Sequence, residues 1–587
     1  MSVDKLITDH IDIWSSALQT RSTAGRGSNG KIDLYGIKKL RELILELAVR
    51  GKLVPQDPND EPASELLKYN EKRKQELAKD GGKKTAANGN INFAEYYFET
   101  PKTWSWIRLG NLAKFIDYRG KTPKKTDSGI RLLTAKNIKK GFIDLNPEEF
   151  IAEQDYQLWM TRGFPKNGDI LFTTEAPLGN AAIINLNDKF ALAQRSICFQ
   201  WHIREISPFM LIQILAKPFQ SQLNVQSTGM TATGIKAAKL KEIPVILPPM
   251  HEQEKVVARV KELMSLCNQL EQQSLSSLDA HQQLLETLLA TLTDSQNAEE
   301  FAENWARISL HFDTLFTTEA SIDTLKQTII QLAVMGKLVP QDPNDEPASE
   351  LLKRIEQEKA QLVKEGKIKK QKPLPPVSDE EKPFALPVGW EWCRFEDIVD
   401  IQSGITKGRN LAGRTLISVP YLRVANVQRG YLQLSDIKSI EIPVEEKDKY
   451  HVQKGDLLIT EGGDWDTVGR TAVWTDTTFY VANQNHVFKA RPLVNELNVK
   501  WLETFMNSSV SRDYFAGASK QTTNLASINK TQLRGCFIAL PPISETSRIL
   551  DQYISLLNVC DTLKSHLQSA QQTQFHLADA LKDAALS

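Results

Sequence analysis

The sequence predicts an α+β protein in which one structural unit occurs twice. Three observations support this prediction. A 22-residue segment occurs twice almost unchanged, about 150 residues of short strand-like runs follow each copy, and a long helix with an apolar heptad pattern closes each copy. We therefore expect two similar α+β domains, two long helices and a pseudo-two-fold internal repeat.

The composition is that of a globular chain whose net charge is zero. Of 587 residues, 41% are hydrophobic, and 72 Lys and Arg balance 72 Asp and Glu. This balance excludes a basic surface over the whole molecule but allows a local one. The chain has no run of about 18 apolar residues and no apolar stretch at its N-terminus. Its five cysteines are far apart, which favours reduced thiols in the cytoplasm and gives no zinc-site spacing.

The repeated segment is the strongest feature of the sequence. Residues 47–68 read LAVRGKLVPQDPNDEPASELLK, and residues 332–353 differ from them only in having Met335 in place of Arg50. Weaker matches follow in the same order, with an offset that drifts from 285 to 293. Drift after a duplication would erode all parts alike. The uneven identity therefore indicates that the repeated segment meets one partner surface twice, while the variable part does two related jobs.

Each copy begins with helices. Apolar residues recur at helical spacing over residues 37–47 and 322–332, and Gly51 and Gly336 follow where a C-terminal cap glycine belongs. The next residues, PQDPNDEP, cannot continue a helix. Charged helices are expected over residues 65–78 and 350–364, and Gly-, Lys- and Pro-rich linkers after them.

The middle of each copy has the pattern of a mixed domain. Short apolar runs such as DILF, ICFQW, DLLIT and HVFKA are separated by Gly, Asn, Asp and Pro, and helical segments are expected near residues 209–223 and 499–514. We predict these divisions: 1–100, a helical repeat segment and linker; 101–249, the first α+β domain; 250–292, the first long helix; 293–386, the central repeat segment and linker; 387–542, the second α+β domain; 543–587, the second long helix.

The closing helices have an apolar seam. Positions spaced alternately by four and three residues run from Ile549 through Tyr553, Leu556, Cys560, Leu563 and Leu567 to Ala570, Gln574, Leu577, Leu581 and Ala584. This spacing is typical of a coiled coil. The first copy has the same stripe from Val256 to Leu270, which passes through Ser274 and Ser277 and resumes on a shifted stripe from Leu278 to Leu292. Two matching stripes in one chain are expected to bury each other, although each helix could instead pack only on its own domain.

The neutral total charge hides a basic first domain. Residues 101–249 contain 20 Lys and Arg against 12 Asp and Glu, a net charge of +8, whereas residues 387–542 contain 18 against 17. The segment YRGKTPKKTDSGIR in the first domain and ITKGRNLAGR in the second are basic and contain glycine. Flexible basic loops of this kind suit contact with phosphates, although an ordinary solvated loop would look the same.

Motifs for catalysis are missing. There is no P-loop, and Leu-Pro-Pro lacks the Asn or Asp that amino-group methyltransferases place before the prolines. Asp456 and Glu461 suggest a nuclease carboxylate pair, but no lysine follows at the required spacing and the first copy has Thr174 in place of Glu461. The sequence therefore favours a binding protein. A self-contained DNA methyltransferase or nuclease, and a coiled-coil scaffold without a nucleic-acid role, remain the alternatives.

Together these features resemble one family. The GKLVPQDPNDEPASELL repeat, the Trp-x-Trp pairs at 104/106 and 390/392, the Gly-Asp-(Ile/Leu)-Leu strands and the Leu-Pro-Pro exits into long helices are similar to those of specificity subunits of type I restriction–modification enzymes. The resemblance covers almost the whole chain. A repeat in the centre and another near the N-terminus resemble the enteric subfamily.

The resemblance implies a non-catalytic subunit. Each α+β domain would be a target-recognition domain for one half of a bipartite, asymmetric DNA site, and the long helices would form an antiparallel coiled coil that sets the gap. The repeats would dock two methyltransferase subunits, and two restriction/translocase subunits would complete the complex. S-adenosylmethionine, ATP and Mg²⁺ would bind to those partners, with no cofactor in this chain and no membrane contact.

The family has no fixed base-reading residues, so the candidates follow from chemistry. Arg, Lys and Asn on loops are the side chains that suit base edges in the major groove and phosphates. The expected DNA-binding residues are Arg119, Lys121, Lys124, Lys125, Arg131, Lys136 and Arg195 in the first domain and Lys407, Arg409, Arg414, Arg423, Arg470, Asn485 and Lys520 in the second.

Overall fold

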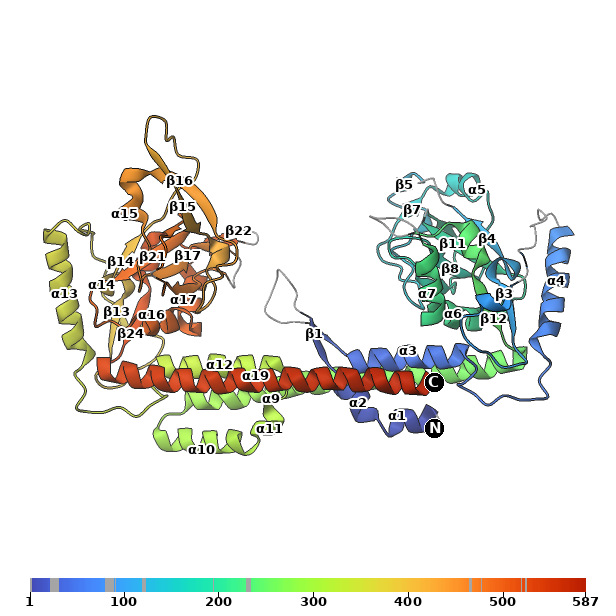
Figure 1. Cartoon of the computed structure of the whole chain (residues 1–587), viewed down its shortest axis with the longest axis horizontal. Helices are drawn as coiled ribbons and strands as arrows, with labels where there is room; N and C mark the ends of the chain where they lie inside the picture. Colours follow the sequence, from blue (N-terminus) through green and yellow to red (C-terminus); the bar gives the residue numbers. More distant parts are fainter. Residues whose placement is uncertain are drawn as a thin grey trace. The chain divides into compact units, whose positions relative to one another are not determined.

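The computed structural model describes residues 3–21, 31–79, 89, 91–118, 123–193, 195–227, 234–463, 467–476, 478–518, 520–522 and 525–586. The chain divides into two compact units. Unit 1 contains Met1–Thr20, Ile32–Ser276 and Gln571–Ser587, and unit 2 contains Arg21–Lys31 and Ser277–Ala570. Each unit therefore holds one α+β domain, one repeat segment, the start of one long helix and the end of the other (Figure 1).

The repeat helices form as the apolar spacing predicts. They are α3 (Tyr35–Val49) and α4 (Ala63–Lys79) in unit 1 and α12 (Glu319–Val334) and α13 (Ala348–Lys364) in unit 2. Gly51 and Gly336 follow α3 and α12 with φ of +69° in both units. A Cβ on either glycine would lie 2.5 Å from Cγ of Pro101 or Pro387, so both the backbone conformation and the close contact require glycine.

A buried carboxylate joins each repeat to its domain and its long helix. In unit 1, Glu252 accepts hydrogen bonds from the Trp104 indole N–H at 2.8 Å and from the Gln56 side-chain amide. In unit 2, Glu545 accepts from Trp390 at 3.1 Å and from Gln341 at 3.1 Å. Burial raises the pKa of both carboxyl groups. The identical PQDP loop is therefore held in the same way in both units.

The domain of unit 1 is built on two four-stranded sheets and one strand pair. Their strand orders are β4-β11-β8-β9, β10-β6-β7-β5 and β12-β3. The bounds are β3 (Ser105–Arg108), β4 (Ala113–Asp117), β5 (Lys125–Thr126), β6 (Ile130–Leu133), β7 (Phe150–Ile151), β8 (Ile170–Thr173), β9 (Ala181–Ile183), β10 (Phe190–Leu192), β11 (Ser196–Trp201) and β12 (Pro244–Leu247).

The domain of unit 2 has sheets in the orders β14-β21-β17-β19, β16-β15-β20, β18-β23-β22 and β13-β24. The bounds are β13 (Glu391–Arg394), β14 (Val399–Gln402), β15 (Leu416–Leu422), β16 (Lys438–Pro443), β17 (Leu457–Thr460), β18 (Gly462–Gly463), β19 (Thr471–Val473), β20 (Ala482–Asn483), β21 (Val487–Pro492), β22 (Lys520–Thr522), β23 (Leu525–Ser527) and β24 (Phe537–Leu540).

The main sheets of the two domains have the same strand order, β4-β11-β8-β9 in unit 1 and β14-β21-β17-β19 in unit 2. In each main sheet, the edge strand that comes first in the chain pairs antiparallel with a later strand, β4 with β11 and β14 with β21. In each, the second sheet contains a parallel pair, β6 with β10 or β15 with β20. The strand-like runs identified in the sequence form the main-sheet strands β8, β9, β11, β17, β19 and β21 and the paired strands β12 and β24.

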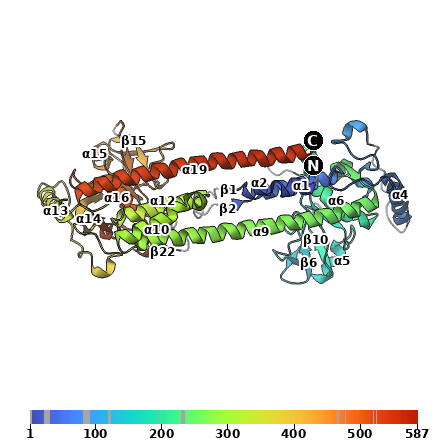
Figure 2. The same cartoon turned by 90° about the horizontal axis from the view of Figure 1, so that it is seen from below.

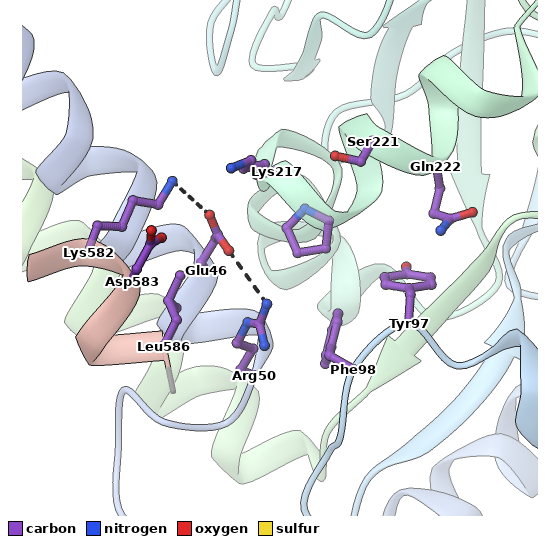
Figure 3. A pocket seen from close by; sticks show the side chains of 11 residues that line it. Glu46, Arg50, Tyr97, Phe98, Lys217, Ser221, Gln222, Lys582, Asp583 and Leu586 are labelled. Carbon is purple, nitrogen blue, oxygen red and sulfur yellow. Dashed lines mark ion pairs between the residues drawn. The ribbon is translucent and has the colours of Figure 1, made fainter. Parts of the chain in front are cut away.

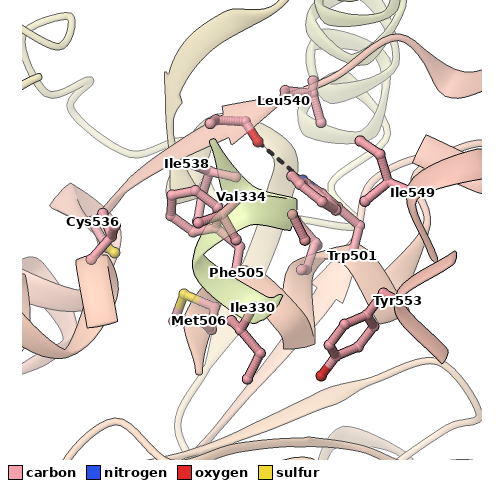
Figure 4. Packing of buried hydrophobic residues seen from close by; sticks show 14 of the residues in the cluster. Ile330, Val334, Trp501, Phe505, Met506, Cys536, Ile538, Leu540, Ile549 and Tyr553 are labelled. Atoms are coloured by element: carbon pink, nitrogen blue, oxygen red, sulfur yellow. Dashed lines mark hydrogen bonds between the residues drawn. The ribbon is translucent and has the colours of Figure 1, made fainter. Parts of the chain in front are cut away.

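Helices cover these sheets. They are α5 (Tyr156–Trp159), α6 (Ser207–Leu215), α7 (Lys217–Gln226) and α8 (Ala237–Glu242) in unit 1 and α14 (Phe395–Ile398), α15 (Lys447–Tyr450), α16 (Val499–Met506), α17 (Ser509–Ala518) and α18 (Lys530–Gly535) in unit 2. The core of unit 2 joins domain, repeat and long helix. Trp501 and Phe505 on α16 pack beside Ile330 and Val334 on α12 and Ile549, and the Trp501 indole N–H donates to the Ala539 carbonyl at 3.0 Å (Figure 4).

The two long helices are α9 (Met250–Asp294) and α19 (Ile543–Leu586), and a repeat helix contacts both of them in each unit. In unit 1, α3 pairs with α9 through Arg41 and Glu271 at 2.6 Å and with α19 through Lys39 and Asp579 at 2.9 Å. In unit 2, α12 lies between α9 and α19 (Figure 2), and Asp323 pairs with Lys564 at 2.9 Å. The apolar stripes thus pack on a third helix that the heptad pattern alone did not show.

The predicted seam of α19 is wrong beyond Leu567. Tyr553 and Cys560 are buried as expected, but Leu577 is 45% exposed while Ala578 and Lys582 are buried instead. The buried stripe moves by one position because a helix of 3.6 residues per turn drifts against a repeat of 3.5. The shift falls at the boundary between the units. In α9 the shifted stripe is confirmed, since the buried residues there are Leu285, Leu289 and Leu292.

The sequence missed several smaller elements. They are α1 (Val3–Thr8), α2 (Ile11–Ser16), α10 (Ala298–Leu310), α11 (Phe312–Leu315), β1 (Gln19–Arg21) and β2 (Lys31–Asp33). The Pro-rich stretch after α13 is also more than a linker, because Arg394 donates hydrogen bonds to the carbonyls of Pro375 and Pro376. Within the described residues, no helix is both long and apolar enough to cross a membrane.

Candidate nucleic-acid interface

The basic segment of unit 1 is only partly described. Arg119 and Lys121 lie outside the described residues. Lys124 is exposed, and Lys125 lies in β5 with its Nζ 2.8 Å from a carboxylate oxygen of Glu149. The prediction of exposed cations in this segment is therefore correct for Lys124 and Lys125, but Lys125 already has an acidic partner.

The other candidates of unit 1 lie around the second sheet and the start of β11. Arg131 in β6 pairs with Glu148 at 2.9 Å. Lys136 is exposed in the turn after β6. Arg195 precedes β11 with a φ of 71°, which is rare for a residue with a side chain, and pairs with Glu175 at 3.0 Å.

A buried asparagine shapes the turn after the same strand in both domains. Asn137 accepts a hydrogen bond from the Thr134 backbone N–H at 2.9 Å and donates to the Asp144 carbonyl at 2.9 Å. Asn426 accepts from the Arg423 backbone N–H at 2.9 Å in the same way. These bonds fix the turns that carry Lys136 and Arg423.

The first candidates of unit 2 gather around one carboxylate. Arg409 and Arg414 lie 2.8 and 3.1 Å from the Glu446 carboxylate, and this pairing, led by the bond from Arg409, lowers the pKa of Glu446. Lys407 is exposed, with its Nζ 5.2 Å from the centre of the Tyr421 ring. The structure thus brings the basic loop together, and it also places an acid inside it.

The remaining candidates of unit 2 have mixed surroundings. Arg423 pairs with Asp436 at 2.8 Å, and Arg470 donates to the Gln428 side chain at 3.0 Å. Asn485 is half-buried in the loop before β21. The backbone of Lys520 lies in β22, and its side chain is outside the described part of the chain.

These ion pairs change the meaning of the charge count. Six of the fourteen candidates, namely Lys125, Arg131, Arg195, Arg409, Arg414 and Arg423, face an Asp or Glu in the free chain. Each pair must open or be shared before the cation can neutralise a phosphate. Exposed pairs of this kind are worth about 0 to 1 kcal/mol, so phosphate can compete for them. Within the described residues, Lys124, Lys136 and Lys407 are exposed candidates without an acidic partner.

Sequence reasoning missed His486, which takes the position of Arg195 in the second domain. The backbone N–H of Thr174 donates to the Arg195 carbonyl at 3.0 Å, and that of Glu461 donates to the His486 carbonyl at 3.0 Å. Arg195 pairs with Glu175, and the His486 imidazole lies 2.6 Å from the Glu461 carboxylate. An alignment of the strands β11 and β21 at an offset of 291 would have paired the two residues.

The carboxylates that suggested a nuclease have structural partners. Asp456 accepts the Gln453 backbone N–H at 2.7 Å and pairs with Arg491 at 2.7 Å, while Glu461 faces His486. In the first domain, Asp169 accepts the Lys166 backbone N–H at 2.8 Å, and burial raises the pKa of this carboxyl. Among the residues that the structure describes, no group of three or more His, Cys, Asp or Glu is arranged to hold a metal ion.

Comparison with known proteins identifies the family. The model of the type I restriction modification DNA specificity domain matches residues 101–280 and 387–569. The chain is 47% identical to the type I restriction enzyme EcoEI specificity subunit of Escherichia coli and 46% identical to the EcoAI specificity subunit of the same organism. Each of these alignments covers 100% of both chains.

Solved structures show a more distant similarity. The crystal structure of the HsdS subunit from Thermoanaerobacter tengcongensis is 17% identical, with a TM-score of 0.38 over 84% of this chain and 99% of that chain. The full-length matches and the two matched domains show that this chain belongs to the family of specificity subunits of type I restriction–modification systems.

Proposed function

We propose that each α+β domain recognises one half of a bipartite, asymmetric DNA site. The observation that carries this proposal is that the two domains share the order of their main sheets but carry different side chains at matching positions. Arg195 and His486, which are both exposed, are such a pair. One scaffold with two different surfaces is what two different half-sites require.

The long helices would set the gap between the half-sites as an antiparallel coiled coil on a pseudo-two-fold frame. The composition of the units supports this, because each contains the start of one long helix and the end of the other. The helices have 45 and 44 residues. At 1.5 Å per residue each is about 65 Å long, enough to separate two recognition domains by about one turn of DNA.

The two repeats would dock two methyltransferase subunits. Side chains that are identical in both repeats and exposed in both units support this, since internal packing does not explain them. They include Pro55 and Pro58 with their equivalents Pro340 and Pro343. The start of α9 and helix α4 also border a groove of about 710 Å³, lined by residues including Tyr69, Met250 and His251.

The chain itself would be non-catalytic. Two restriction/translocase subunits would complete the complex, and S-adenosylmethionine, ATP and Mg²⁺ would bind to the partner subunits rather than to this chain. The complex would act on chromosomal DNA in the cytoplasm. The alternative is a self-contained methyltransferase or nuclease.

Methyl transfer distinguishes the two possibilities. We expect the purified chain alone to transfer no methyl group from S-adenosylmethionine to DNA, and its complex with methyltransferase subunits to methylate adenines in a split sequence. Transfer by the isolated chain would contradict the proposal. A complex that methylates without sequence preference would also contradict it.

The spacer role has its own test. Inserting seven residues after Ser276 in α9 and after Ala570 in α19 lengthens both helices by about 10 Å, which corresponds to about three base pairs. We expect a longer gap with both half-sites unchanged, measured by mapping N6-methyladenine. A gap of the original length would remove the spacer role.

A further inference from the structure

The one residue that differs between the repeats lines a cavity. In unit 1, Arg50 borders a hollow of about 460 Å³ between α3, α7 and the last turns of α19 (Figure 3). Glu46 contributes from α3, Lys217 from α7, and Lys582 and Leu586 from α19. The single departure from identity thus lies where the repeat meets the end of the second long helix.

A buried ion pair closes this contact. The Lys582 ammonium lies 2.9 Å from a carboxylate oxygen of Glu46, and the two side chains are 3% and 5% exposed. Glu42 lies 3.1 Å from the same ammonium. Arg50 lies 3.7 Å from the second carboxylate oxygen of Glu46 and stacks over Phe98. Figure 3 shows both ion pairs of Glu46.

Unit 2 contains the same contact without these charges. Lys52 donates to the Leu586 carbonyl at 2.8 Å in unit 1, and Lys337 donates to the Thr293 carbonyl at 2.5 Å in unit 2. The two lysines are 285 residues apart and the two carbonyls are 293 apart. By the same offsets, the residues of unit 2 that match Glu46, Arg50 and Lys582 are Gln331, Met335 and Leu289.

In unit 2, the contact between the end of α9 and α12 is apolar, and within the described part of the chain it leaves no buried charge. Leu289 is buried in the core cluster with Ile329 and Ile330 of α12. Gln331 accepts a hydrogen bond from the Ser509 hydroxyl of α17. The end of α9 therefore packs on α12 through Leu289 without an ion pair, whereas the end of α19 packs on α3 through the ion pair of Lys582 and Glu46.

We propose that Glu46, Arg50 and Lys582 are a pairing lock, which makes the N-terminal repeat accept the end of α19 and reject the end of α9. If α3 met the end of α9, Glu46 would be buried against Leu289, would lose the Lys582 ammonium at 2.9 Å and would keep only Arg50 at 3.7 Å. If α12 met the end of α19, Lys582 would be buried against Gln331 without an acid. Leaving one buried charge without its partner disfavours the wrong pairing by roughly 100-fold or more.

The lock matters because the ends of α3 and α12 are otherwise alike. Both end in Leu-Ala-Val, and both are followed by a glycine and by a lysine that donates to the end of a long helix. An α9 packed on α3 near Asn268 is a rigid helix and cannot also bring Leu289 back to that α3, so a wrong pairing needs a second chain. In the resulting dimer, the first repeat of each chain would pack on α9 of the other chain, and the second repeat of each chain would pack on α19 of the other chain. The lock therefore favours closure of one chain on itself, with the two unlike domains once each, over a symmetric swapped dimer.

The test is refolding of the full chain at about 0.5 mM, where pairing between chains competes with intrachain closure at a roughly millimolar effective concentration. The triple variant E46Q/R50M/K582L gives unit 1 the residues of unit 2. We expect it to fold with a melting temperature near that of the wild type but to form swapped dimers, measured by size exclusion with light scattering, in at least a tenfold larger fraction.

Two matched variants complete the design. K582L alone leaves Glu46 buried with only the longer contact to Arg50 at 3.7 Å, so we expect its melting temperature to fall by about 5 °C. Adding L289K, Q331E and M335R to the triple variant moves the lock to unit 2, and we expect monomers again. A triple variant that refolds as monomeric as the wild type, or that does not fold, would overturn the proposal. Dimers in the moved-lock variant would also overturn it.

Discussion

The buried carboxylate at the start of α9 gives a quantitative prediction. Glu252 is 1% exposed and accepts the indole N–H of Trp104, which is itself buried. E252A removes this acceptor and leaves the indole N–H unsatisfied in the core. One unsatisfied buried donor costs about 1 to 3 kcal/mol. The exposed Gln56 amide can turn to water and adds little.

Burial of the carboxylate itself reduces the net effect. Because burial raises the pKa of Glu252, part of the energy gained from the two hydrogen bonds is already offset in the folded chain. We therefore expect E252A to lower the free energy of unfolding of unit 1 by about 1 to 2 kcal/mol. E252Q keeps an acceptor for Trp104 and should cost less than about 1 kcal/mol.

Hydrogen exchange separates the two units in this experiment. E252A should speed exchange in β3 and β12 and leave β13 and β24 unchanged. E545A should do the reverse, because Glu545 holds Trp390 in the same way. Equal loss of protection in both units, or a loss below about 0.5 kcal/mol in unit 1, would refute the reasoning.

Three further predictions follow from particular contacts. G51A should destabilise unit 1 by at least about 2 kcal/mol, because φ is +69° and Pro101 fills the space, whereas G408A, with φ of +74° and open space around it, should cost only about 1 kcal/mol in denaturant unfolding. Burial lowers the pKa of Lys489 to about 8. From pH 8 to about 10.5 the unfolded chain therefore holds more protons than the folded chain. In urea titrations, the free energy of unfolding of the wild type should rise relative to that of K489M by up to about 1.4 kcal/mol per pH unit. A difference that stays constant with pH would contradict this. R195A should weaken binding of the complex to one half-site by about 1 to 3 kcal/mol, and H486A should weaken binding to the other half-site. Fluorescence anisotropy with duplexes altered in one half measures both effects. Weaker binding to both half-sites in one variant would argue against separate domains.

Periodicity and repetition revealed most of the fold. The apolar spacing predicted α3 and α12 because a helix must bury one stripe, and the strand-like runs predicted the central strands because they are buried on both faces. The prediction that Gly51 and Gly336 cap the two helices is also confirmed. These features are local, so neighbouring residues in the sequence determine them.

Long-range pairing could not be predicted in this way. Arg409 meets Glu446, 37 residues away, and Lys582 meets Glu46 from the other end of the chain. No local pattern connects such residues, so the basic loops seemed less compensated than they are. The seam of α19 failed past Leu567 for a different reason, because a helix of 3.6 residues per turn drifts against the 3.5-residue repeat that the prediction assumed.

Replacement of one domain tests the central claim most directly. Residues 101–249 would be exchanged for the corresponding residues of another specificity subunit with a known target, and N6-methyladenine would be mapped across the genome of cells that carry the hybrid. We predict that one half-site changes to that of the donor, while the other half-site stays as it was. A change in both half-sites, or in neither, would contradict the claim that each domain recognises its own half of the site.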